Sequence, residues 1–239
     1  MFYGACDVVL SPSRASDERL GELGIPNERI RRWDRGVDLN RFDPAHRDVD
    51  LLPGEVNVLY AGRLSKEKGV DLLADAFLAA RRSDPRLHLV LAGGGPEEDL
   101  LRARLGEYAT FLGWLTGTDL ARAYASADVF LFASSTETFG QVVLESQASG
   151  LPVVAVDRGG PASLIEHGET GLLAPPEVNA LADAVLAVTS TPLLGERIGR
   201  GALAAVRGRS WEAALDRLAA AYRIALSARG DQTLARDVA

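Results

Sequence analysis

The sequence predicts an α/β protein built on a doubly wound parallel sheet, and two observations support this expectation. From residue 55 onward, short apolar runs alternate with segments of helical periodicity, which is typical of parallel strands with helices on both faces. Most of the apolar runs are nearly continuous in Val, Leu, Phe and Ala, as expected for strands buried on both faces. The predicted strands are Val56–Ala61, Leu87–Ala92, Thr110–Leu112, Asp128–Ala133 and Pro152–Val156.

Helices are expected between and after these strands, at Lys66–Arg82, Pro96–Gly106, Thr118–Ser126, Gly140–Ser149 and Ala162–His167. Beyond Glu177 the pattern indicates only helix, ending in an amphipathic segment, Trp211–Leu226, and a frayed tail. The first 36 residues stand outside this alternation. They predict a strand, a helix and a second strand, at Asp7–Leu10, Arg14–Leu23 and Arg29–Trp33.

Composition and charge exclude several classes of protein. The 239 residues are 47% hydrophobic and 25% charged, the usage of an ordinary globular protein. No stretch of about 20 apolar residues occurs and no basic segment opens the chain, so we expect neither a membrane span nor a signal peptide, and a cytoplasmic location. Cys6 is the only cysteine, which excludes an internal disulfide. The net charge of −7 argues against a nucleic-acid-binding protein.

A glycine- and lysine-containing loop, Gly62–Gly69, follows the first strand, at the carboxyl end where open parallel sheets bind ligands. Lys66 and Lys68 are the only lysines of the chain, and the dipole of the following helix disfavours each by about 0.3–1 kcal/mol. A bound anion would reverse this preference. Arg63 can grip two phosphate oxygens, whereas a lysine acts as a point charge, so the loop indicates a diphosphate site. The alternative is a solvated turn in which Glu67 neutralises one charge.

A second candidate site combines two carboxylates with the start of a helix. Glu137 lies in the loop after strand Asp128–Ala133, and Glu145 lies inside the next helix, which separates the carboxylates by about 8–10 Å along the helix axis. Free N–H groups at this helix N-terminus, an anion site, belong to Thr138, Phe139 and Gly140. A carboxylate accepts two hydrogen bonds from a vicinal diol, so the spacing indicates sugars on both sides of a diphosphate. Helix capping by Glu137 and an arginine salt bridge to Glu145 stay open as alternatives.

No metal site is expected from the sequence. Asp48-Val49-Asp50 has the spacing of a metal-binding Asp-x-Asp motif, but no strand precedes it, so we expect it to be solvated. The three histidines share no ligand spacing. Trp114, just past a predicted strand, is a candidate to stack on a nucleobase, although simple packing of its ring is the favoured alternative.

The motifs, taken in order, resemble those of one enzyme family. They comprise Gly62-Arg63 with Lys68-Gly69, Gly93-Gly94-Gly95-Pro96, Phe111-Leu112-Gly113, Ala127-Asp128-Val129-Phe130, Glu137-x7-Glu145, Gly150-Leu-Pro-Val-Val-Ala155, Gly159-Gly160 and His167-Gly168-Glu-Thr-Gly171. In order and spacing, from Val8 to Leu226, the chain is similar to the group 1 (family 4) retaining glycosyltransferases of the GT-B fold. The resemblance implies transfer of a sugar from a nucleoside diphosphate to an acceptor hydroxyl, without a metal or other cofactor.

The resemblance also implies roles for residues and segments. Arg63 and Lys68 hold the diphosphate and form the expected catalytic set with Glu137, which contacts the donor sugar, while Glu145 holds the ribose. The other expected donor-binding residues are Gly62, Gly94, Leu115, Thr138, Phe139 and Gly140. By the same resemblance, residues 1–36 end an otherwise missing acceptor domain, 37–54 are a linker, 55–205 form the nucleotide-sugar donor domain, 206–228 a helix that crosses back, and 229–239 the tail.

The sequence indicates the identity of the sugar donor and of the acceptor less specifically than it indicates the fold. Trp33-Asp34-Arg35-Gly36-Val37-Asp38 is similar to relatives that use GDP-mannose and to sulfolipid synthases that use a UDP-sugar, so a GDP- or UDP-hexose is expected, with mannose favoured. The acceptor is an alcohol, for which a lipid is a candidate, and membrane-surface contact is expected only through the missing domain. The alternatives are a GT-B-like sugar-nucleotide epimerase and a non-catalytic nucleotide-sugar-binding fragment. The isolated chain is expected to be inactive in transfer.

Overall fold

The computed structural model describes residues 2–236, and its larger part is a six-stranded parallel sheet with the strand order β5-β4-β3-β6-β7-β8. The five predicted strands are confirmed within a few residues, and the sixth, β8, was missed because it has only three residues, two of them half-buried. The strands are β3 (Val56–Ala61), β4 (Leu87–Ala92), β5 (Ala109–Gly113), β6 (Val129–Phe132), β7 (Val153–Val156) and β8 (Leu172–Ala174).

Helices cover both faces of this sheet, which confirms the doubly wound prediction. Along β3, Val58 and Tyr60 belong to one buried core, whereas Leu59 and Ala61 belong to the other, because successive side chains of a strand point to opposite faces. The first core also contains residues of α2 (Val70–Ser83), α3 (Glu98–Leu105) and α7 (Val178–Ser190), and the second contains residues of α4 (Gly117–Ser126) and α5 (Gln141–Ala148).

The strand order changes direction between β3 and β6. From β3 the chain continues outward to β4 and β5, then crosses back to β6, which pairs in parallel with β3 through Val58–Val129 and Leu59–Phe130. At such a switch point the loops at the carboxyl ends of the two strands diverge and leave a crevice for ligands. The loops that follow β3 and β6 are those that carry the predicted diphosphate and sugar contacts.

Two predicted helix boundaries were wrong. Residues Lys66–Lys68 form a 3-10 turn, and α2 begins only at Val70, because Gly69 adopts a left-handed conformation with φ +69° that ends the turn. The helix predicted at Ala162–His167 is instead α6 (Gly159–Ala162). Pro161 lies within that short helix, in agreement with the tolerance of a first turn for proline.

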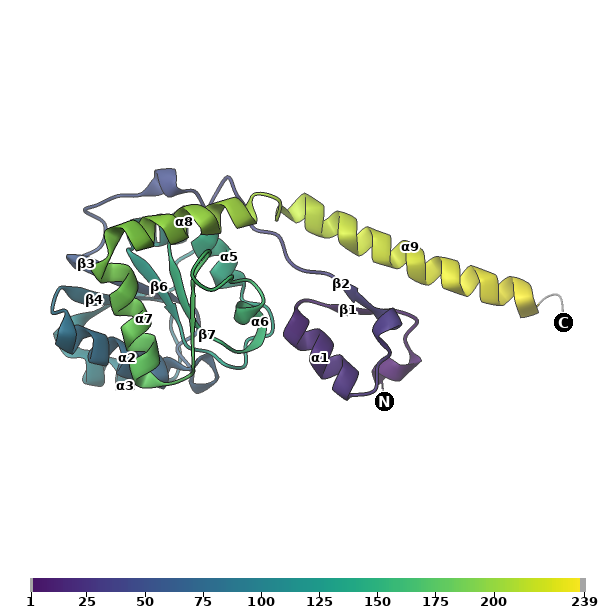
Figure 1. Cartoon of the computed structure of the whole chain (residues 1–239), viewed down its shortest axis with the longest axis horizontal. Coiled ribbons are helices and arrows are strands. Elements are labelled where there is room, and N and C mark those ends of the chain that lie inside the picture. Colours follow the sequence, from purple (N-terminus) through teal and green to yellow (C-terminus); the bar gives the residue numbers. More distant parts are fainter. Residues whose placement is uncertain (1, 237–239) are drawn as a thin grey trace.

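The N-terminal region forms a separate, smaller unit. In it β1 (Val9–Ser11) pairs in parallel with β2 (Ile30–Arg32) across α1 (Arg14–Glu22), which confirms the predicted strand, helix and strand. In Figure 1 this unit lies beside α6, against which α1 packs, and apart from the six-stranded sheet.

The C-terminal region consists of helices joined by short connections up to residue 236. A helical break at Thr191 separates α7 from α8 (Pro192–Val206), and the pair bends there by 99°. This pair together has the length and apolar composition of a membrane span, but no single helix within residues 2–236 does. The last helix, α9 (Trp211–Arg236), extends away from the larger body and continues past the predicted end at residue 228. Residues 229–236, expected to form a tail, are helical, and residues 237–239 lie outside the described part.

The predicted linker, residues 37–54, is folded onto the second core. Val37, Phe42 and Leu52 are each at most 6% exposed, and a 3-10 turn forms at Pro44–His46. The guanidinium of Arg47 donates hydrogen bonds to backbone carbonyls at the end of α4 and pairs with a carboxylate before β6. The segment is thus anchored to the sheet rather than free between two domains.

Candidate functional site

The loops after β3 and β6 are tied together at the switch point. The hydroxyls of Ser134 and Thr136 both donate to the backbone carbonyl of Glu67, each at 2.9 Å. Gly69 packs so closely on the carbonyl oxygen of Ala133 that a Cβ atom would lie 2.3 Å from it. Because hydroxyl groups and a close backbone contact join the loops, the side chains that they carry keep fixed positions relative to one another.

Lys68 and Glu137 meet across this junction. The Nζ atom of Lys68 lies 2.7 Å from Oε2 of Glu137, with the two side chains 31% and 21% exposed. The sequence predicted both residues as donor contacts on separate loops, and the structure brings them together as a half-buried ion pair. The pair therefore places a cation and a carboxylate side by side at the carboxyl edge of the sheet.

The carboxylate of Glu137 also occupies the N-terminus of α5. Its Oε1 atom accepts a hydrogen bond from the N–H of Phe139 at 3.3 Å. Burial raises the pKa of Glu137, but the Lys68 ammonium and the N–H groups of Phe139 and Gly140 outweigh it and hold this pKa below the ordinary value. The expectation that these N–H groups are free was wrong, because Glu137 itself is the anion that they bind. Glu137 therefore caps α5 in the unliganded chain, which is the alternative that the sequence left open.

The short helix α6, which follows β7, also contacts the segment from Glu137 to Phe139. The N–H of Gly160, in α6, donates to the carbonyl of Glu137 at 2.7 Å. A Cβ atom on Gly160 would lie 2.4 Å from the backbone of Thr138 and Phe139, so only glycine permits this approach. Gly140 then opens α5 in the left-handed conformation, with φ +94°. The predicted residues Thr138, Phe139 and Gly140 thus form one braced turn between the end of β6 and the start of α5.

Arg63 is exposed, and its guanidinium forms no hydrogen bond or ion pair with any residue in the described range. Its backbone is held from below, because the buried Tyr60 hydroxyl donates to the Arg63 carbonyl at 2.7 Å. Gly62 donates its N–H to Ala92 at the end of β4. Gly94, in the loop after β4, accepts the N–H of the residue that follows Arg63. The predicted diphosphate cation is therefore positioned by its backbone but has a side chain free for a ligand.

Trp114 and Leu115 follow β5, two strands from the ion pair along the same edge of the sheet. Trp114 is 68% exposed, so the favoured expectation that its ring packs in the protein was wrong. The ring lies close to Gly94, since a Cβ atom on Gly94 would come within 2.9 Å of the indole nitrogen of Trp114. Leu115 is half-buried against the second core. The exposed indole therefore offers a flat apolar face at the carboxyl edge of the sheet, beyond the outermost strand β5.

Glu145 lies on α5 and is largely buried. The hydroxyl of Tyr124, on α4, lies 3.2 Å from Oε2 of Glu145 and donates to it. Burial raises the pKa of Glu145 to about 7, against the lowering effects of the Tyr124 hydrogen bond and the charge of Arg41. No arginine forms an ion pair with Glu145 within the described residues, so the salt-bridge alternative was wrong. Tyr124 and Arg41 were missed because neither belongs to a recognisable motif.

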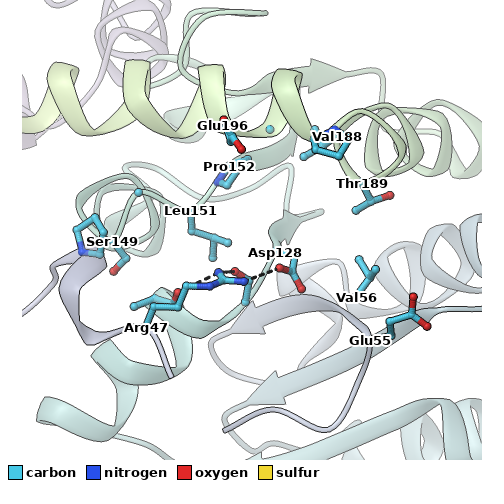
Figure 2. A pocket seen from close by; sticks show the side chains of 16 residues that line it. Arg47, Glu55, Val56, Asp128, Ser149, Leu151, Pro152, Val188, Thr189 and Glu196 are labelled. Atoms are coloured by element: carbon cyan, nitrogen blue, oxygen red, sulfur yellow. Dashed lines mark hydrogen bonds and ion pairs between the residues drawn. The ribbon is translucent and has the colours of Figure 1, made fainter. Parts of the chain in front are cut away.

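A different cavity lies at the amino ends of the strands, away from these loops. It measures about 520 Å³ and is crossed by the ion pair of Arg47 with Asp128, at 2.9 Å (Figure 2). Its lining includes Ser149, Pro152 and Glu196, and none of the predicted site residues. The charged groups of its wall are already paired within the protein, whereas Arg63 at the opposite edge is not.

Within the residues that the structure describes, no group of three or more His, Cys, Asp or Glu side chains could hold a metal ion. Asp48, of the Asp-x-Asp motif, pairs with Arg122 on α4 at 2.7 Å. Hydrogen bonding by Arg122 lowers the pKa of Asp48. This carboxylate therefore anchors the segment before β3 to α4, and the expected solvation of the motif is only partial.

Comparisons with known proteins place the chain in one enzyme family. Residues 55–191 match the family described as glycosyl transferases group 1. The chain is 43% identical over 237 residues to a GDP-mannose-dependent alpha-mannosyltransferase of Mycobacterium tuberculosis, covering 95% of this chain and 58% of that protein. It is 36% identical to a D-inositol 3-phosphate glycosyltransferase of Pseudarthrobacter chlorophenolicus, covering 87% of this chain and 53% of the relative. The chain thus spans little more than half the length of these relatives.

Solved structures share the same fold. A sucrose-phosphate synthase from Thermosynechococcus elongatus superposes with a TM-score of 0.81 at 30% identity, covering 93% of this chain and 59% of that one. HepE of Anabaena, solved in complex with UDP, superposes with a TM-score of 0.80 at 26% identity, covering 91% and 64%. The family match covers more than half of the chain, and the relatives carry it to nearly the full length. The chain therefore belongs to the group 1 glycosyl transferases.

Proposed function

We propose that this chain forms the donor-binding half of a retaining hexosyltransferase that moves a mannosyl group from GDP-mannose to an acceptor hydroxyl. The alpha-mannosyltransferase relatives, named for GDP-mannose, support this donor, and the UDP complex of HepE supports a nucleoside diphosphate on this fold. The acceptor, for which a lipid alcohol is a candidate, the transfer step and a cytoplasmic location are proposed for the whole protein. In that protein, residues 1–36 would belong to the acceptor side.

The observation that carries this proposal is the pairing of Lys68 with Glu137 across the switch point. In the free chain the two charges neutralise each other at 2.7 Å, and the start of α5 also bonds the Glu137 carboxylate. A diphosphate supplies anionic oxygens for Lys68, for the unpaired Arg63 and for the helix N-terminus. A hexose supplies hydroxyl groups that can donate hydrogen bonds to the Glu137 carboxylate. Donor binding would thus exchange one ion pair for two sets of ligand contacts.

The same groups account for the proposed chemistry. In transfer, the bond between the anomeric carbon and the β-phosphate oxygen breaks, and the diphosphate leaves with the electron pair. The acceptor oxygen forms the new glycosidic bond on the same face of the sugar, and its proton passes to a phosphate oxygen. Lys68, Arg63 and the positive end of the α5 dipole stabilise the charge that develops on the diphosphate. Three positive sources therefore meet the leaving group without requiring a metal.

A Glu137→Gln variant tests the exchange of partners. Removing the carboxylate frees Lys68 and the α5 N–H groups for phosphate, so we expect the affinity for GDP to rise by about threefold to tenfold. The affinity for GDP-mannose should rise less or fall, because the amide is a weaker acceptor for sugar hydroxyls. Calorimetric titration of the same protein with GDP and GDP-mannose measures both. An equal loss of affinity for the two ligands would contradict the proposed exchange.

Removal of divalent metal ions should leave donor binding intact. With excess EDTA, the affinity of the chain for GDP-mannose is expected to stay within about twofold, because Arg63, Lys68 and the α5 N-terminus supply the positive charge. The same titration repeated with added magnesium or manganese provides the comparison. A tenfold loss in EDTA that either metal restores would show that the diphosphate is held through an ion.

A further inference from the structure

The second glutamate of the site is held by an aromatic cluster that no motif identifies. Tyr124 is fully buried, with its ring 5.7 Å from Phe42 in an edge-to-face contact and 5.5 Å from Phe130. Phe42 comes from the segment before β3, and Phe130 from β6. Because two other parts of the chain pack against the ring, the Tyr124 hydroxyl is held in place, and there it meets Oε2 of Glu145 at 3.2 Å.

The two oxygens of Glu145 differ as a result. Oε2 accepts the hydrogen bond of Tyr124, whereas Oε1 bonds no described residue and still reaches solvent. Burial and the nearby carboxylate raise the pKa of the Tyr124 phenol well above its ordinary value, so this group remains a proton donor at any pH of interest. The hydrogen bond therefore always favours the ionised form of Glu145 and leaves one oxygen available.

We propose that Tyr124 is a positioning residue for donor binding, which fixes one oxygen of Glu145 so that the other is presented to the ribose hydroxyls. This inference rests on the proposed function, since it takes Glu145 as the ribose contact. Phe42 holds the phenol in place, and thereby makes the segment before β3 part of the donor site. Tyr124 itself touches no ligand and acts only through Glu145.

Few other charged groups act on this carboxylate. Arg41, next to Phe42, acts on Glu145 through its charge and also pairs with Asp38 at 3.5 Å. Tyr60 on β3 acts on Tyr124 and not on Glu145. The ionisation of Glu145 thus depends on burial, on one hydroxyl and on one arginine, so that removing the hydroxyl has a measurable effect on its pH midpoint.

A Tyr124→Phe variant tests the proposal, because it keeps the ring and deletes only the hydroxyl. We expect the carboxyl midpoint of Glu145, followed by ¹³C NMR in the ligand-free chain, to rise by about one pH unit. The affinity for GDP-mannose at pH 7 should then fall by more than about fivefold, and a smaller loss should remain at pH 9, where the carboxyl is ionised in both proteins but is no longer held by the hydroxyl. A loss of packing alone would weaken binding equally at both pH values.

Ser146→Ala is the matched control, since it also deletes a buried hydroxyl of α5, one that donates to the carbonyl of Leu151 at 3.2 Å. It should lower the melting temperature without moving the Glu145 midpoint. An unchanged midpoint in Tyr124→Phe overturns the proposal. If Glu145→Gln binds GDP-mannose as tightly as the parent at pH 8, the ribose assignment fails instead, and the carboxyl titration of the ligand-free protein still decides the role of Tyr124.

Discussion

Replacing Lys68 with alanine is expected to weaken the binding of GDP by about 10- to 100-fold, because a charge-assisted contact with phosphate contributes about 1.5–3 kcal/mol. The loss also leaves Glu137 without the cation that neutralises it at 2.7 Å, so an uncompensated carboxylate would face the diphosphate. Arg63→Ala should weaken GDP binding over the same range, though it leaves no charge unpaired. The affinity for guanosine, which has no phosphate, should change little in either variant. Calorimetry with GDP and guanosine measures the difference.

Lys66→Ala is the control for this effect. Lys66 lies in the same loop as Lys68, but its side chain is exposed and forms no ion pair with the residues described here. Removing its charge changes the net charge of the protein as much as Lys68→Ala does. We expect a change in GDP affinity of about twofold at most, which is the scale of an exposed, screened charge. If Lys66→Ala and Lys68→Ala weakened binding equally, a diffuse electrostatic field rather than a built site would attract the diphosphate.

Glu145→Gln is expected to stabilise the ligand-free protein at alkaline pH. The folded chain raises the pKa of Glu145 from 4.5 to about 7, so the folded state keeps a proton that the unfolded state has lost. The stability that this provides is complete below pH 4.5 and is lost as the pH rises through 7. Above that pH the buried carboxylate costs about 3 kcal/mol relative to a neutral group. The glutamine, which is neutral throughout, avoids this cost.

Urea unfolding at pH 5 and pH 8 measures this difference. The free energy of unfolding of Glu145→Gln should exceed that of the parent at pH 8 by up to about 3 kcal/mol, and the gap should shrink towards pH 5. Glu107→Gln, which removes an exposed carboxylate, should change stability little at either pH. The stabilised variant should nevertheless bind GDP-mannose about tenfold more weakly, through loss of a charge-assisted acceptor. Equal stabilities at pH 8 would mean that Glu145 is ionised there without cost.

The elements predicted well from the sequence are those whose pattern is local. Strands β3, β4 and β6 are continuous or nearly continuous apolar runs, so their position and burial follow from residue type. Short elements without such a run were missed or misplaced, as with β8 and α6, because tertiary hydrogen bonds and a proline turn decide them. The segment before β3 was predicted to be a linker because of its aspartates, prolines and glycine, and the burial of Phe42 depends on packing that no local pattern shows.

In the candidate site, too, local patterns were predicted and tertiary contacts were not. Arg63, Lys68, Glu137 and Glu145 were recognised because their spacing belongs to a motif at the carboxyl end of a strand or the start of a helix. The pairing of Lys68 with Glu137 was not predicted, since it depends on β3 and β6 being neighbours in the sheet. Tyr124 was missed for a related reason. It lies on a helix between two other strands, and only packing brings its hydroxyl to Glu145.

Nucleoside diphosphate sugars are proposed to bind at the carboxyl edge of the sheet, between β3 and β6. Amide shift mapping of the ¹⁵N-labelled chain during titration with GDP-mannose locates the bound ligand. We predict that the shifted amides lie in Gly62–Gly69 and Glu137–Gly140, and that those around Ser149 and Pro152, in the cavity at the amino edge, do not move. Shifts concentrated around that opposite cavity, or none at saturating ligand, would show that the donor does not bind at the carboxyl edge.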